Sequence, residues 1–169
     1  MVLTLKLKHH IFLFWALLLL WILLTGSVAI EELASGVVVA LVVSLFSAPY
    51  LSILDGLRYQ PMALLSAFSY LGYFLVALVR ANFDLARRVL SPSLPINPAI
   101  IEVETRLTSQ LGRILLANSI TLTPGTLTVD LMQQKILVHW VAAPEGKDLQ
   151  QATLEIVSGF EKHIGGFLE

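Results

Sequence analysis

Threonine hydroxyls crowd one short stretch of this sequence, NSITLTPGT. Its polar and turn-forming residues, together with an acid four positions beyond it, are Asn118, Thr121, Thr123, Pro124, Gly125, Thr126 and Asp130. Clustered hydroxyl oxygens could coordinate an ion or hold a phosphate. Pro-Gly instead fits the centre of a type II turn, and neighbouring threonines can bond the local backbone. Because the stretch lacks the glycines and lysine of a phosphate loop, we expect a folding turn. The alternative is a contact with an ion or a partner.

His139, within the apolar run ILVHWV, is the second candidate. A single histidine on a strand is usually packed or hydrogen-bonded, and a pH-sensing role is the alternative because imidazole titrates near neutrality. No acid or second histidine stands near it at metal-binding spacing, and the chain has no cysteine, which excludes thiolate sites and disulfides. We therefore expect no enzyme activity, no catalytic residue, no bound metal and no cofactor.

The two halves of the chain, which must position these residues, differ in composition. Of the 169 residues 56% are hydrophobic and 14% are charged, whereas soluble domains carry about 25% charged residues. Residues 1–90 hold six Lys or Arg and four acids, and residues 91–169 hold five and eight. No basic run suggests nucleic-acid binding. This balance predicts a membrane region over residues 1–90 and a soluble domain after it.

Three apolar segments of about 20 residues, the length that crosses a bilayer, lie in the first half. They are Ile11–Ile30, Leu33–Leu54 and Tyr59–Val79, and we expect helices over about 11–30, 33–54 and 61–90. A secretory signal peptide is the alternative for the first, but two further apolar segments follow it. None of the three contains Asp, Lys, Arg or His, and Glu31 and Glu32 fall between the first two. Because ionisable groups mark ion pathways in membranes, this chain should not transport ions alone.

The first two segments should form a helical hairpin whose connection lies around Glu31 and Glu32. Small residues recur every four positions in the second segment, at Gly36, Ala40 and Ser44, and such a stripe lets another helix approach closely. We expect partner subunits to pack on it. Lysines before the hairpin and Arg58 after it predict, by the positive-inside rule, that both ends are cytoplasmic.

The third segment is predicted to be an amphipathic helix from Pro61 to Leu90. Its polar or small positions recur every three or four residues, at Ser66, Ser69, Tyr70, Tyr73, Ala77, Arg80, Asp84 and Arg87. The helix either spans the membrane, or lies at the interface with this polar stripe outward, or packs on protein. We favour the last two alternatives, which leave the C-terminal domain in the cytoplasm.

The rest of the chain predicts a small α+β domain over residues 99–169, after a Pro- and Ser-rich linker at 91–98. The expected elements follow the order β-α-β-β-α, and they are a strand at 100–105, a helix at 108–119 burying Leu111, Ile114 and Leu115, strands at 126–131 and 135–141, and a helix at about 148–168. Both helices should cover one face of the sheet.

The block LLANSITLTPGTLTVDL, followed by KILVHWV, resembles the signature of the E subunit of Mrp-type multi-subunit Na+/H+ antiporters, the MnhE or PhaE family. The resemblance extends over nearly the whole chain. It implies a place in a complex of six or seven subunits in a prokaryotic plasma membrane, which exchanges cytoplasmic Na+ for external protons. It also implies that other subunits carry the ionisable relay, and it assigns no catalytic residue here.

Two functions follow from these patterns. The first is an accessory subunit of a cation/proton antiporter, whose partners are the other subunits and the lipid bilayer, with no nucleic acid and no small-molecule substrate. The second is a membrane-tethered regulatory domain in which the threonine-rich turn and His139 bind or sense a cytoplasmic ligand.

Overall fold

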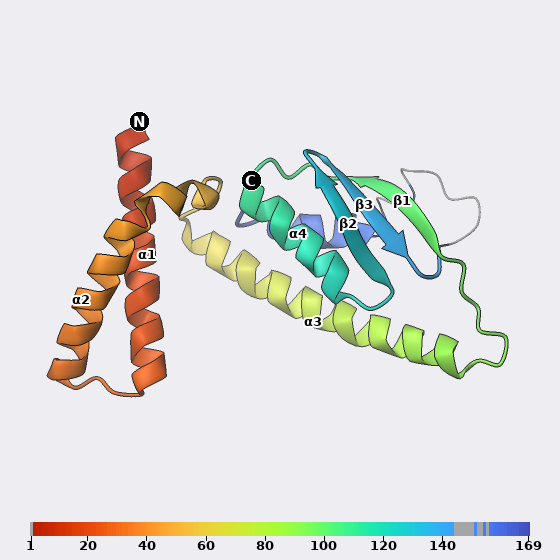
Figure 1. The fold of residues 1–169 in the computed structure, drawn as a ribbon, viewed down its shortest axis with the longest axis horizontal. Helices are drawn as coiled ribbons and strands as arrows, with labels where there is room; N and C mark the ends of the chain where they lie inside the picture. Colours follow the sequence, from red (N-terminus) through yellow and green to blue (C-terminus); the bar gives the residue numbers. More distant parts are fainter. Residues whose placement is uncertain (1, 144–150, 152–153, 155) are drawn as a thin grey trace. The chain divides into compact units, whose positions relative to one another are not determined.

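A computed structural model describes residues 2–143, 151, 154 and 156–169, with side chains described from Leu7 onward. The chain divides into two compact units, Met1–Asp55 and Gly56–Glu169, and each is considered by itself (Figure 1).

The first unit is built on a hairpin of α1 (Val2–Thr25) and α2 (Ile30–Phe46). α1 ends where Gly26 adopts a φ of +63° and its N–H bonds to the carbonyl of Ile22 at 2.9 Å, a glycine helix stop. The predicted end at residue 30 and the predicted connection at the two glutamates are therefore wrong. Residues 26–29 make the connection, and Glu31 and Glu32 lie in the first turn of α2, where carboxylates complement the helix dipole.

The predicted single helix over 33–54 is also wrong, because the chain bends by 84° between α2 and the 3-10 helix η1 (Ala48–Leu54). Pro49 explains the break, since proline lacks an N–H and clashes with the preceding helical turn. The 17 residues of α2 are about 26 Å long. Among the described residues, Leu7–Thr25 and Pro61–Leu90 have the length and apolarity to cross a membrane, and the bent pair makes a third candidate if it counts as one span.

The second unit contains α3 (Pro61–Leu90), β1 (Ala99–Glu104), α4 (Gln110–Leu122), β2 (Thr126–Met132), β3 (Lys135–Trp140) and α6 (Ser158–Ile164). The three strands form an antiparallel sheet in the order β1-β3-β2, with a bulge in β2 between Thr128 and Asp130. The predicted α+β order is confirmed. Most of the first half of the predicted last helix, residues 148–150, 152, 153 and 155, lies outside the described residues.

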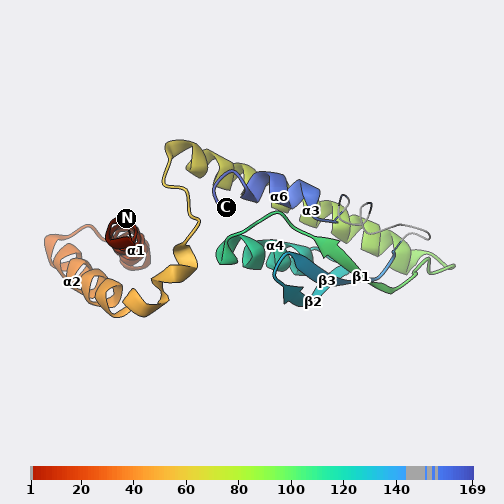
Figure 2. The ribbon, with the colours of Figure 1, turned by 90° about the horizontal axis from the view of Figure 1, so that it is seen from above.

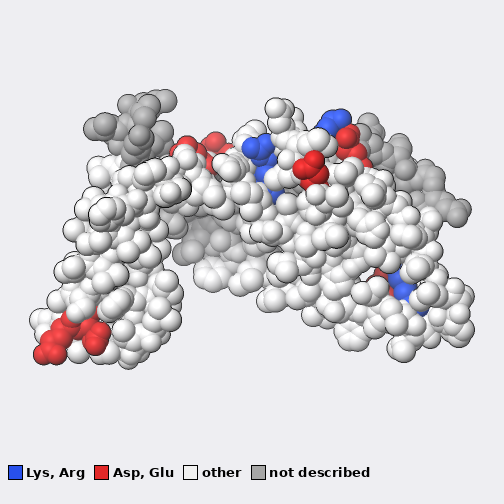
Figure 3. All heavy atoms as spheres, viewed as in Figure 1, with Lys and Arg blue, Asp and Glu red and all other residues white. Residues whose placement is uncertain are grey.

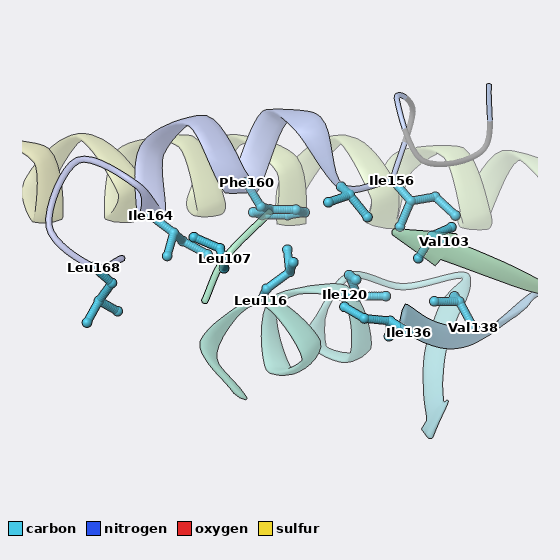
Figure 4. Close-up of a cluster of buried hydrophobic side chains, with 11 residues drawn as sticks. Val103, Leu107, Leu116, Ile120, Ile136, Val138, Ile156, Phe160, Ile164 and Leu168 are labelled. Atoms are coloured by element: carbon cyan, nitrogen blue, oxygen red, sulfur yellow. The ribbon is translucent and has the colours of Figure 1, made fainter. Parts of the chain in front are cut away.

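One face of the sheet carries the core, as Figure 4 shows, with side chains from β1, β3, α4 and α6 pointing toward one another. Its fully or nearly buried members are Val103, Leu107, Leu116, Ile120, Ile136, Val138, Ile156, Val157, Phe160, Ile164 and Leu168. On α4 the central positions are Leu116 and Ile120, whereas the predicted Leu111 and Leu115 lie at the margin. The buried face of α4 therefore differs from the predicted one. It includes the fully buried Ser119, a polar residue that a pattern of apolar positions does not identify.

α3 also belongs to this unit, although the sequence placed the domain boundary after it, at 91–98. Viewed from above, α6 lies alongside α3, and the sheet and α4 form a second layer that faces both helices (Figure 2). Tyr70, Tyr73, Phe74 and Ala77 of α3 pack against the core. The fold therefore includes the long apolar helix as one wall of the α+β domain.

Candidate functional site

The small-residue stripe of α2 is buried at all three of its positions, Gly36, Ala40 and Ser44. A Cβ atom on Gly36 would lie 2.6 Å from Cδ1 of Trp21, so the indole fills the space that glycine leaves. Trp21 is fixed there because its Nε1–H donates to the carbonyl of Glu32 at 3.0 Å. The stripe does allow close helix approach, but α1 of the same chain covers it, rather than the partner subunits that the sequence analysis predicted.

Two histidines lie inside α1, because this helix begins nine residues earlier than predicted. Nδ1 of His10 donates to the carbonyl of Ser44 at 2.9 Å, and Oγ of Ser44 donates to the carbonyl of His10 at 3.1 Å. His9 is 3% exposed, and its Nδ1 lies 3.7 Å from Oδ1 of Asp55. Ionisable side chains thus lie at one end of the hairpin, and the sequence analysis missed their contacts because they join residues more than thirty positions apart.

The threonine-rich stretch forms the expected type II turn, with Gly125 at a φ of +96° and the N–H of Thr126 bonded to the carbonyl of Thr123 at 3.3 Å. Its hydroxyls bond the carbonyls of Ser119 and Ile120 in the last turn of α4, which also share the N–H of Thr123. Oγ1 of Thr123 donates to the carbonyl of Ser119 at 2.7 Å, and Oγ1 of Thr126 donates to the carbonyl of Ile120 at 2.6 Å. These two hydroxyls are therefore bonded to the backbone at the end of α4, where they stabilise the turn.

Thr121 completes the turn from the other side, because its Oγ1 accepts a bond from the N–H of Thr128 at 3.1 Å. Asn118 and Asp130 are exposed, and Oδ1 of Asp130 accepts the N–H of Leu131 beside the bulge at 2.7 Å. Pro124 is partly exposed at the first central position of the turn. The residues of the stretch thus connect α4 to β2 and do not converge on a cavity.

Ser119 joins this same stretch to α3. Its Oγ donates to the carbonyl of Leu115 at 2.7 Å and lies 2.7 Å from the hydroxyl of Tyr70, which therefore donates to it. Ser119 is completely buried, so this bond satisfies polar groups that would otherwise cost stability. Ser119 is not among the site residues predicted from the sequence, because local periodicity does not reveal its burial.

Gly159 on α6 and Gly166 in the turn after it lie in close contact with α3. A Cβ atom on Gly159 would lie 1.9 Å from the hydroxyl oxygen of Tyr73, and one on Gly166 would lie 2.5 Å from Oγ of Ser66. Between these two positions His163 stacks on the ring of Tyr73, with centroids 4.7 Å apart, and its Nδ1 lies 3.0 Å from Oγ of Ser69. From Ser66 to Ala77 the polar stripe of α3 therefore packs on its own domain, as the alternative of a helix packed on protein predicts, whereas Arg80, Asp84 and Arg87 of the same stripe are exposed.

His139 lies on the other face of the sheet, opposite Ile100 of β1 and Leu127 of β2. It is partly exposed. Further along this face, Nζ of Lys135 donates to a carboxylate oxygen of Glu102 at 2.6 Å. That hydrogen bond and the charge of Glu102 raise the pKa of Lys135.

An open groove of about 1070 Å³ lies between the ends of β1 and β3, α6 and the last residues. Charges of both signs line it, and Glu161 is engaged within it, accepting bonds from Oγ1 of Thr105 at 2.7 Å and the N–H of Arg106 at 2.5 Å. Across residues 7–143, 151, 154 and 156–169, no group of three or more His, Asp or Glu side chains is placed to hold a metal ion.

The chain is similar in sequence to known proteins over most of its length. A family model described as Na+/H+ ion antiporter subunit matches residues 14–166. The chain is 34% identical to the E1 subunit of the Na(+)/H(+) antiporter of Staphylococcus haemolyticus over 77% of this chain and 80% of that relative. It is 36% identical to the corresponding Na(+)/H(+) antiporter protein of Bacillus subtilis, but this alignment spans only 57% of that relative and 54% of this chain.

Among solved structures, the chain is similar to a subunit of the membrane-bound sulfane sulfur reductase, an archaeal respiratory membrane complex. The TM-score is 0.79 at 35% identity, over 93% of this chain and 97% of that chain. The hairpin, the long α3 and the α+β domain thus occur together in a chain of another membrane complex.

Proposed function

This chain belongs to the family of Na+/H+ ion antiporter subunits, and on that premise we propose that it is an accessory subunit of a multi-subunit Na+/H+ antiporter in a prokaryotic plasma membrane. The complex supports pH and sodium homeostasis, and the other subunits move the ions. Na+ is the cation in the names of the relatives and comes to this chain as part of the proposal.

The observation that carries the accessory role is the distribution of charge on the hairpin. α1 has no ionisable residue from Ile11 to its end, and α2 has none after Glu32. The surface of the hairpin turned to the viewer in Figure 3 is correspondingly uncharged between its ends. A proton or cation crossing the bilayer centre needs charged or polar groups there, so a path along this hairpin is not supported.

The α+β domain is placed in the cytoplasm in this proposal. α1 and α2 form a hairpin, so the chain enters and leaves the membrane on one side, and the flanking basic residues are Lys6, Lys8 and Arg58. Short basic segments stay in the cytoplasm. A reporter enzyme fused after Glu169 should therefore give a cytoplasmic signal, and an external signal would contradict this orientation.

The accessory role is tested by reconstituting three preparations in liposomes: the whole complex, the complex purified from cells lacking this chain, and this chain alone. We expect Na+-driven proton movement from the whole complex only. The preparation lacking this chain should contain fewer of the other subunits, since its role is in assembly. Full exchange and full subunit content without this chain would contradict the proposal.

A further inference from the structure

α3 is about 45 Å long for its 30 residues, and its outer face is apolar except at the exposed Asn82, whose Nδ2 donates to the carbonyl of Leu78 at 2.8 Å. Its large exposed side chains, between 48% and 82% accessible, are Met62, Leu64, Leu65, Phe68, Leu71, Leu75, Val76, Val79, Phe83, Val89 and Leu90. The surface over α3 in Figure 3 is largely uncharged, with basic atoms toward its carboxyl-terminal end. A soluble protein rarely exposes a continuous apolar surface of this length, so something covers this face.

The opposite face of the helix decides how a membrane can cover it. On that face Tyr70 bonds to Ser119 of α4, and Ser69 and Tyr73 contact His163 of α6. If α3 crossed the bilayer, these polar groups and the exposed side chain of Lys162 would enter hydrocarbon with it. That burial is expensive, so α3 must lie along the surface while its domain stays in water.

Charged residues on one edge of the apolar face indicate which kind of lipid surface it contacts. Arg80 and Arg87 are exposed and seven residues apart, so they lie at nearly the same angle around the helix. Both are at one edge of the apolar face. The next arginine, Arg88, is instead engaged with Asp84 at 2.7 Å and with the carbonyl of Pro95 at 3.0 Å. Long arginine side chains beside an apolar strip reach lipid headgroups, and two of them favour anionic ones.

Chain length brings α3 to the membrane. Six residues, 55–60, separate η1 from α3, so seven Cα–Cα steps join Leu54 to Pro61 and span at most about 25 Å. Because η1 continues a membrane hairpin, α3 begins within that distance of the last residue of η1, whatever the orientation of the two parts.

We propose that α3 is a lipid-binding helix that lies in the interface of an anionic bilayer, with its apolar face in the acyl-chain boundary and Arg80 and Arg87 on phosphate groups. The α+β domain stands on the other face of this helix and is thereby held at the membrane surface. This inference does not depend on which ion the complex moves, so its failure would leave the proposed function standing.

Single cysteines test the position of the helix, because the chain has none of its own. The full-length variants Leu64→Cys, Leu75→Cys and Val89→Cys carry an environment-sensitive fluorophore in liposomes of phosphatidylcholine and phosphatidylglycerol. Thr108→Cys, exposed in the domain, is the control. Nitroxide lipids quench each label according to its depth. We expect one shallow depth for all three α3 labels and no quenching at Thr108.

A label at Leu75 near the bilayer centre, with the other two near opposite surfaces, would show that α3 spans and would overturn the proposal. Absence of quenching on α3 would overturn it too. The labels are then measured in the whole reconstituted complex. Quenching that persists there supports lipid as the occupant, and quenching lost on assembly would show that a partner subunit covers the face.

Lipid charge is tested with a label at Val79→Cys and the nitroxide on either phosphatidylglycerol or phosphatidylcholine. We expect the anionic lipid to be enriched about two- to fivefold near the label. The double variant Arg80→Gln with Arg87→Gln should abolish this preference. The matched variant Arg106→Gln with Lys135→Gln, which removes two exposed charges elsewhere, should retain it. Equal quenching by the two lipids in the unmodified chain would contradict the role of the arginines.

Discussion

Replacing Gly159 by alanine should lower the free energy of unfolding of the domain by about 2–3 kcal/mol, although alanine favours helices. The added Cβ would lie 1.9 Å from the hydroxyl oxygen of Tyr73 and 2.6 Å from Cζ of its ring. The ring has no free space to move into, because it stacks on His163 and meets Phe160 edge-on at 5.2 Å. The added atom should therefore push α6 away from α3. Chemical denaturation followed by tryptophan fluorescence measures the loss.

Gly72→Ala on the exposed face of α3 is the matched control. No atom lies within 4 Å of the added Cβ there, so this change should be neutral or stabilise by about 0.5–1 kcal/mol. The pair Gly159→Ala with Tyr73→Phe removes the nearest clashing atom and should be less destabilised than the two single changes predict. Unchanged stability of Gly159→Ala would show that α6 does not approach α3 as described.

Replacing Gly36 by leucine should have a comparable effect on the hairpin, costing about 2–3 kcal/mol. Its first added atom already lies 2.6 Å from Cδ1 of Trp21, whose indole is held by the carbonyl of Glu32. α1 and α2 would have to separate along the buried stripe. Because a loss of this size changes protein abundance several-fold, we expect several-fold less assembled complex on native gels.

Val38→Leu controls for added volume, because Val38 is 61% exposed on the same helix. It should leave the amount of complex unchanged. Combining Gly36→Leu with Trp21→Ala should restore part of it, since the smaller side chain makes room for leucine. A Gly36→Leu variant that assembles as well as the unmodified chain would contradict the packing of α1 on the stripe.

Local sequence signals were enough to predict the strands, the type II turn and the amphipathic character of α3. The helix ends at Gly26 and Pro49 also carried local signals, and they were misplaced because hydropathy continues past both residues. α1 begins early for a related reason, since His9 and His10 interrupt the apolar run without interrupting the helix.

The partners of each face could not be predicted, because they depend on contacts between distant positions. Tyr73 meets Gly159 and Tyr70 meets Ser119, and nothing in the spacing around either tyrosine identifies these partners. The polar stripe of α3 was correctly located, but amphipathicity alone does not say whether water or protein covers the polar side. For the same reason, the predicted buried face of α4 differs from the observed one, which contains Leu116 and Ile120.

We propose that this chain supports the assembly of the antiporter complex and does not move ions itself. The most direct measurement is Na+-dependent proton movement in liposomes that contain this chain alone, followed with a pH-sensitive dye. We expect a rate equal to that of protein-free liposomes, while the whole complex in the same lipid is active. Exchange by the chain alone, above the protein-free rate and dependent on Na+, would contradict it.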